Sequence, residues 1–153
     1  MTEPVTDNPP RAGARRGARR AALQAIYQWL AAGTETGDLV LQFQRSELMR
    51  GADGDYFTTL VRGVLAQPQR YEERFAAYLD RAPGLLDPVE RAILLLAVFE
   101  LCECPQVPYR VVLNEAVELA KAYGAEASHR YINAVLDAAA GALRPLEASP
   151  DRG

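Results

Sequence analysis

Residues 87–102, DPVERAILLLAVFELC, form the stretch that decides the fold. Asp87 is a typical N-cap, Pro88 suits the first helical position, and Glu90 stands where a capping box would close. A helix is therefore predicted to begin here and to end before Pro105. Its residues are apolar on nearly every face, and a helix without a polar face must be surrounded by other helices. The stretch predicts the central helix of a bundle.

Apolar residues recur at helical spacing on both sides of this central helix. The pattern predicts six further helices, over residues 14–32, 38–49, 55–66, 69–81, 109–123 and 128–143. No segment alternates apolar and polar residues convincingly, as a half-buried strand would. The expected fold is all-α, with about seven helices in two packed helical bundles. The bundles are expected to divide near residues 82–86, where Pro83-Gly84 breaks the chain.

The length of 153 residues fits one domain. We expect a single helical domain over residues 13–146, a disordered N-terminal tail over residues 1–12, and a disordered C-terminal tail over residues 147–153. The longest apolar run, Ala92–Phe99, is far shorter than the roughly 20 residues that a membrane span needs. No apolar stretch of the signal-peptide kind follows the first arginines. A cytoplasmic protein without a membrane partner is therefore expected.

Residues suited to catalysis are few. The single histidine, His129, stands where a helix is expected to begin, and it is either a general base or an ordinary exposed side chain. Cys102 and Cys104 are too close in sequence for an unstrained disulfide, so reduced and partly buried thiols are expected. The acidic pair Glu115 and Glu118 is expected on a solvated helix surface. No phosphate-binding glycine loop or zinc motif is present in the sequence, so we expect no enzyme, no cofactor and no metal site.

The charge distribution is uneven, although the net charge is only −3. Residues 1–20 carry five arginines against two acidic residues, whereas the rest of the chain carries 12 basic and 18 acidic residues. A basic end on an acidic body is typical of a protein that binds an anionic partner through that end.

The basic end continues into the first predicted helix. On a helical wheel of about 100° per residue, the arginines fall in the same sector as the large apolar residues, and the alanines fall opposite. The arginines are Arg16, Arg19 and Arg20, the apolar residues are Leu23, Ile26, Tyr27 and Leu30, and the alanines include Ala18, Ala21 and Ala25. This arrangement predicts guanidinium groups that grip phosphates beside Tyr27, whose ring would stack on an unpaired base. The alternative is a frayed, solubilising arginine tail, which applies if the helix begins only near Arg20.

A second basic and aromatic pair, Arg130-Tyr131, opens the last predicted helix. The N-terminal dipole of a helix favours anions, so this pair is also a candidate for binding RNA.

Five segments, in order and with ordinary spacing, resemble the NusB family of transcription antitermination factors. The segments are 14–29 (ARRGARRAALQAIYQW), 55–64 (DYFTTLVRGV), 89–94 (VERAIL), 107–116 (VPYRVVLNEA) and 123–137 (YGAEASHRYINAVLD). The resemblance covers residues 14–145, which is close to the whole expected domain.

This resemblance implies a NusB-like fold and no enzymatic activity. It implies binding of the boxA element in ribosomal RNA leader transcripts, together with a small-subunit ribosomal protein that acts as NusE. The complex would join NusA, NusG and RNA polymerase in an antitermination complex. The residues implied to contact RNA are Arg15, Arg16, Arg19, Tyr27, Arg130 and Tyr131, with Arg20 added from the helical wheel.

The resemblance also implies a partner surface at Glu90, Arg91 and Leu94. Glu90 has a second possible role, because it could instead cap the backbone of Asp87. Two departures from the family pattern are Gly17, where many relatives carry a basic residue, and Ala127, where some carry an acidic one. A protein-interaction module or homodimer, without direct RNA binding, remains the alternative function.

Overall fold

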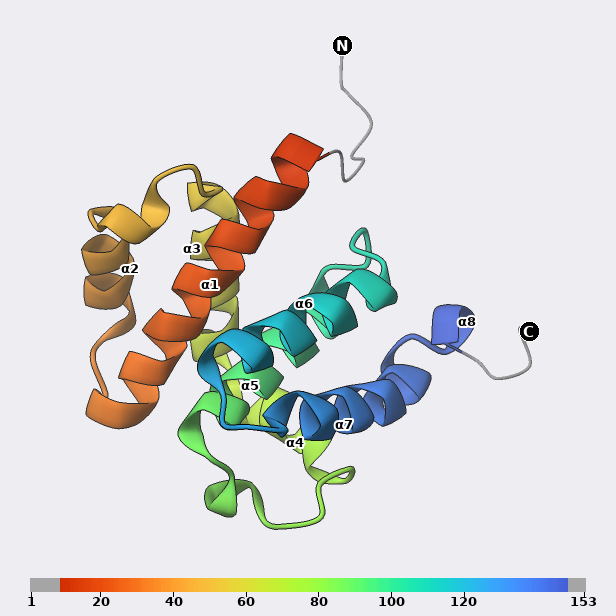
Figure 1. The fold of residues 1–153 in the computed structure, drawn as a ribbon. Helices are drawn as coiled ribbons and strands as arrows, with labels where there is room; N and C mark the ends of the chain where they lie inside the picture. Colours follow the sequence, from red (N-terminus) through yellow and green to blue (C-terminus); the bar gives the residue numbers. More distant parts are fainter. Residues whose placement is uncertain (1–8, 149–153) are drawn as a thin grey trace.

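The computed structural model describes residues 9–148, which form α-helices and two 3-10 turns and contain no strand (Figure 1). The helices are α1 (Pro9–Ala32), α2 (Thr36–Gln44), α3 (Gly54–Ala66), α4 (Pro68–Ala76), α5 (Pro88–Glu103), α6 (Tyr109–Tyr123), α7 (Ser128–Leu143) and α8 (Pro145–Ala148). The turns are η1 (Glu47–Met49) and η2 (Pro83–Leu85). The all-α prediction is confirmed, and the helix not predicted is the four-residue α8.

Helix α5 is the centre of the molecule, as its sequence predicts. The Asp87 side chain caps it by accepting hydrogen bonds from the backbone N–H groups of Val89, at 2.8 Å, and Glu90, at 3.4 Å. Every residue from Ala92 to Leu101 is buried. The helix packs against α1 and α3 on one side of the fold and against α4, α6 and α7 on the other. Even so, no helix within residues 9–148 combines the length and apolarity of a membrane span.

The other helices form two bundles that share α5. Helices α1, α2 and α3 contact one another in the first bundle, while α7 contacts α4 and α6 in the second. Figure 1 shows α6 and α7 side by side, while α1 lies with α2 and α3. The chain passes from the first bundle to the second between α3 and α4, ahead of the division expected near residues 82–86, where the turn η2 joins α4 to α5.

Several helix boundaries differ from the predictions. Helix α1 begins at Pro9, so residues 9–12 are helical and do not belong to a tail. Helix α4 ends at Ala76, five residues before its predicted end. Helix α8 includes the first two residues of the expected C-terminal tail. Residues 1–8 and 149–153, on which the other tail predictions fall, lie outside the described residues.

The predicted helix over residues 38–49 is divided into α2 and η1. Ser46 follows α2, and its hydroxyl donates a hydrogen bond to the Phe43 carbonyl at 2.9 Å. A side chain that binds the carbonyl three residues back competes with the helical pattern, and the chain turns here. At its start, α2 is capped by Glu35, whose carboxylate accepts from the N–H groups of Gly37 and Asp38.

The orientation of α1 also differs from the prediction. Ala18, Ala21 and Ala25, which were expected on the exposed side, are completely buried. They are buried because α1 packs against both α3 and α5, and small side chains allow such close packing. A similar close approach joins α3 to α5, where a Cβ atom at Gly63 would lie 2.2 Å from the Phe99 ring.

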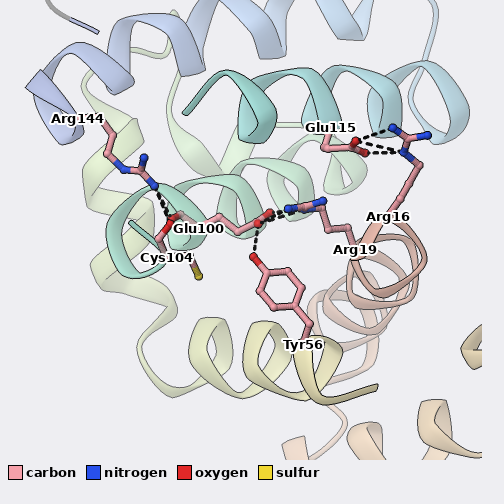
Figure 2. A network of polar contacts seen from close by, with 7 residues as sticks. All are labelled: Arg16, Arg19, Tyr56, Glu100, Cys104, Glu115 and Arg144. Atoms are coloured by element: carbon pink, nitrogen blue, oxygen red, sulfur yellow. Dashed lines mark hydrogen bonds and ion pairs between the residues drawn. The ribbon is translucent and has the colours of Figure 1, made fainter. Parts of the chain in front are cut away.

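A buried arginine, Arg144, closes the end of α5. Its guanidinium donates hydrogen bonds to the carbonyl oxygens of Leu101, Cys104 and Val107 at 2.8 to 3.0 Å, and to that of Glu100 at 3.3 Å. Figure 2 shows this contact beside the other polar contacts of α5. The last carbonyl groups of a helix have no hydrogen-bond donor within the helix, so Arg144 supplies the donors that the end of α5 lacks.

Candidate nucleic-acid interface

Three of the predicted RNA-binding side chains share the exposed face of α1. Arg16, Arg20 and Tyr27 lie within about 40° of one another around the helix, at 100° per residue. All three are exposed, and 43% of Tyr27 is accessible to solvent. Guanidinium groups bind phosphates through paired N–H donors, and a tyrosine ring can stack on an unpaired base. This face therefore carries side chains suited to binding a single strand of nucleic acid.

Arg16 is held in place by an acidic residue of α6. Its Nε and Nη2 atoms donate to the Glu115 carboxylate at 2.9 to 3.2 Å, and this hydrogen bonding raises the pKa of Arg16. Glu115 is only 12% exposed, which corrects the expectation of a solvated side chain. The Arg16 side chain as a whole nonetheless remains 55% exposed, so it stays at the surface of the molecule.

Arg19 faces inward, contrary to its predicted role in binding RNA. It is only 3% exposed, and its guanidinium donates to the Glu100 carboxylate of α5 at 2.8 to 3.1 Å. The Tyr56 hydroxyl of α3 donates to the same carboxylate at 2.5 Å, as Figure 2 shows. Burial alone would lower the pKa of Arg19, but the hydrogen bonds and charge of Glu100 outweigh it and raise that pKa. Arg19 holds three helices together and cannot reach RNA in this structure.

Arg15 also turns toward this internal network. Its guanidinium carbon lies 4.7 Å from the centre of the Tyr56 ring, and that of Arg19 lies 5.6 Å from the same centre. The arginine cluster is thus divided, with Arg15 and Arg19 around Tyr56 and with Arg16 and Arg20 outward. The roles of Tyr56 and Glu100 were not predicted from the sequence, although the position of Glu100 indicates a need for a buried partner. A carboxylate within an otherwise buried apolar helix requires a cationic or hydrogen-bonding partner.

The second predicted pair lies in the other bundle. Arg130 is exposed in the first turn of α7, and Tyr131 is half-buried. The Tyr131 hydroxyl donates to Asp80 at 3.0 Å, and the Arg81 guanidinium lies 4.7 Å from the ring centre. Hydrogen bonds from Arg81 and then from Tyr131 lower the pKa of Asp80 to about 2. The structure therefore places Tyr131 with Asp80 and Arg81, in the bundle that does not contain the arginines of α1.

The predicted partner surface requires correction at two of its three residues. Leu94 is completely buried in the core, so it cannot contact a partner. Glu90 is also buried, and its carboxylate accepts a hydrogen bond from the Ser128 hydroxyl at 2.8 Å, which joins α5 to α7. Only Arg91 lies partly at the surface, where it pairs with Glu72 of α4 at 2.8 Å.

A groove of about 460 Å³ lies beside the exposed face of α1. Four helices contribute to its lining, which consists of Leu23, Gln24, Tyr27, Gln28 and Ala31 from α1, Phe43 from α2, Val89 from α5 and Tyr123 from α6. Tyr27 and Tyr123 are both exposed aromatic residues. A concave surface with apolar walls and a few polar groups is typical of a binding site.

Comparison with known proteins identifies the family. A family model described as the NusB family matches residues 16–141. The chain belongs to the NusB family. It is 49% identical over 146 residues to the transcription antitermination protein NusB of Alcanivorax borkumensis, with 95% of this chain and 97% of that protein covered. It is 44% identical over 133 residues to the NusB protein of Nitrosomonas eutropha, with 87% and 80% covered.

Solved structures of the NusB family have the same fold. T. maritima NusB aligns with a TM-score of 0.73 at 27% identity, covering 99% of this chain and 97% of that one. A chain in a crystal structure of the antitermination factors NusB and NusE in complex with double-stranded RNA aligns with a TM-score of 0.73 at 25% identity. That alignment covers 84% of this chain and 97% of the other. The NusB-like fold expected from the sequence is confirmed.

Proposed function

We propose that this chain is a cytoplasmic transcription antitermination factor that binds boxA-type RNA of ribosomal RNA leader transcripts. It acts together with the small-subunit ribosomal protein NusE, within a complex that includes NusA, NusG and RNA polymerase. Membership of the NusB family supports the proposal, as does the likeness to a structure of NusB and NusE with RNA. The chain acts by binding, without catalysis of its own and without a cofactor.

The observation that carries this proposal is the exposed face of α1. Arg16, Arg20 and Tyr27 lie together on it, with guanidinium groups for the phosphates and a ring for an unpaired base. The buried pair of Arg19 and Glu100 fixes the rotation of α1, so this face is presented without rearrangement. Arg130 and Tyr131 of α7 provide a second RNA contact in the proposal.

The partner protein occupies the groove beside Tyr27 in this proposal. Val89, which lines the groove, directly precedes Glu90, the first residue of the partner surface predicted from the sequence. The exposed ring of Tyr123 offers apolar contact, which the buried Leu94 cannot. In this arrangement the RNA and the partner protein both bind to surfaces formed by α1.

The test is binding of a fluorescently labelled boxA-type RNA, measured by anisotropy across a range of salt concentrations, with NusE added or withheld. If Arg16, Arg20 and Arg130 each neutralise one phosphate, log affinity against log salt has a slope of roughly −2. The expected slope is shallower if Arg16 and Arg20 are changed to alanine. An affinity that does not respond to salt would count against the proposal.

The groove also favours a second function, in which the chain is a homodimer or protein-interaction module without direct RNA contact. Light scattering at several protein concentrations, with and without RNA, separates the two functions. A tight dimer that RNA neither binds nor dissociates would favour this second function.

A further inference from the structure

We propose that Arg20 and Arg50 together form a pocket for one phosphate of a single-stranded RNA, beside the exposed face of α1. This inference rests on the proposed function and adds a contact from the segment between α2 and α3. That segment contains none of the residues that the sequence predicts to bind RNA.

The pocket lies where the η1 segment meets α1 and has a volume of about 270 Å³. Its lining comprises Gly13, Gly17 and Arg20 from α1, and Glu47, Leu48, Arg50 and Gly51 from η1 and the turn after it. In Figure 1 this segment runs alongside α1 on the side away from α6. Arg20 therefore belongs to both surfaces, the exposed face of α1 and the pocket.

Gly17 explains why the segment lies so close to α1. A Cβ atom at Gly17 would be only 3.0 Å from the Cβ atom of Ala52, so a larger residue would push the segment away. The backbone N–H of Asp53 donates to the Ala14 carbonyl of α1 at 2.9 Å. Gly51 makes the turn with a φ of +74°, a conformation that favours glycine. Because Gly17 has no side chain, the segment that carries Arg50 can pack closely against α1.

Hydrogen bonds and packing within the segment order its backbone, including the backbone of Arg50. The backbone N–H of Arg50 donates to the Glu47 carbonyl, and that of Ala52 donates to the Met49 carbonyl, at 3.0 to 3.1 Å. Leu48 and Met49 pack against the hydrophobic core. A residue whose backbone is already ordered loses less conformational freedom when it binds a ligand.

The charges in the pocket favour an anion. The lining contains two arginines and one carboxylate, that of Glu47, which lies 3.9 Å from the Arg50 guanidinium. Both of these side chains are more than 80% exposed, and an exposed pair at this distance contributes little. A phosphate offers the two guanidinium groups several oxygens at hydrogen-bonding geometry, so it can displace the weak pair. The pocket thus fits a backbone phosphate.

The test is a double-mutant cycle with R20A, R50A and the double variant R20A/R50A. The full chain is titrated against a labelled boxA-type RNA by anisotropy, at several salt concentrations. Each single change is expected to weaken binding about tenfold, because each removes charge-assisted hydrogen bonds. If both arginines hold the same phosphate, the double variant loses clearly less than the product of the two single losses. Because the two arginines share one phosphate, the double variant is expected to make the salt slope shallower by about 0.7, the value for one phosphate of a single strand.

The matched control is R45A, which removes an exposed arginine of the same segment that does not line the pocket. It is expected to bind RNA within about twofold of the unmodified chain. Thermal unfolding of every variant checks that the fold is intact. Unchanged binding by R50A, or an equal loss in R45A, would overturn the pocket while RNA binding by the unmodified chain still upholds the proposed function. If the unmodified chain binds no RNA, both proposals fail together.

Discussion

Arg19 and Arg20 are adjacent in the sequence, but one is buried and the other is exposed. A step of about 100° around α1 turns Arg19 toward Glu100 and Arg20 toward solvent. The sequence predicts a cationic cluster here, and the structure contains one. The separation of structural from ligand-binding arginines depends on a carboxylate 81 residues away, which a local pattern does not reveal.

Changing Arg19 to alanine is expected to lower the free energy of unfolding by about 3–5 kcal/mol, because it leaves the Glu100 carboxylate buried without its partner. Changing the exposed Arg20 to alanine is expected to alter it by no more than about 0.5 kcal/mol. Urea denaturation of the two variants measures the difference. If Arg19→Ala were as stable as the unmodified chain and had lost RNA binding, Arg19 would have to point outward in solution.

At the scale of a helix, the sequence predicts the presence of α1 but not its rotation. The large residues Leu23 and Ile26 were correctly expected to be buried, whereas the alanines behind them were expected in solvent. Alanine is compatible with both the core and the solvent. The sequence of a helix with an alanine face therefore does not indicate whether that face is buried. Leu94 shows the opposite problem, because a helix that is apolar all round, such as α5, gives no indication of which face could meet a partner.

The close approach of α3 and α5 can be tested with glycine substitutions. Gly63→Ala is expected to destabilise the fold by about 1–3 kcal/mol, because the added Cβ would overlap the Phe99 ring. Gly141→Ala in α7 is the control, since no atom lies within 4 Å of its added Cβ. It is expected to stabilise the fold by up to about 1 kcal/mol through helix propensity. Thermal unfolding of both variants measures the two effects, and a gain in stability at Gly63 would show that α3 and α5 are less tightly packed.

At the scale of the whole molecule, the sequence predicts the helices and the central position of α5, because caps, breaks and apolar spacing are local signals. Contacts between distant residues follow from how the helices pack, so they were not predicted. Glu90 illustrates the difference. Its place in the first turn of α5 was predicted, but its hydrogen bond to Ser128 of α7 was not.

Folding and RNA binding are expected to respond differently to salt. The Arg19–Glu100 pair is buried, and exposed pairs such as Arg70–Glu103 contribute little to stability. The free energy of unfolding should therefore change by less than about 1 kcal/mol between 0.05 and 0.5 M salt. RNA affinity should fall about a hundredfold over the same range. Urea denaturation and anisotropy in matched buffers measure the two quantities, and parallel losses would mean that salt weakens binding by unfolding the chain.

Glu100 links the beginning and the end of the chain, because its carboxylate binds Arg19 and its carbonyl oxygen accepts from Arg144. On the ribosome, α1 leaves the exit tunnel well before either of these later residues is made. At about 5–20 residues per second, the 81 residues from Arg19 to Glu100 take several seconds to translate. A nascent chain that stops short of Glu100 lacks the carboxylate that sets the rotation of α1, so the first helix to be synthesised acquires its final orientation among the last.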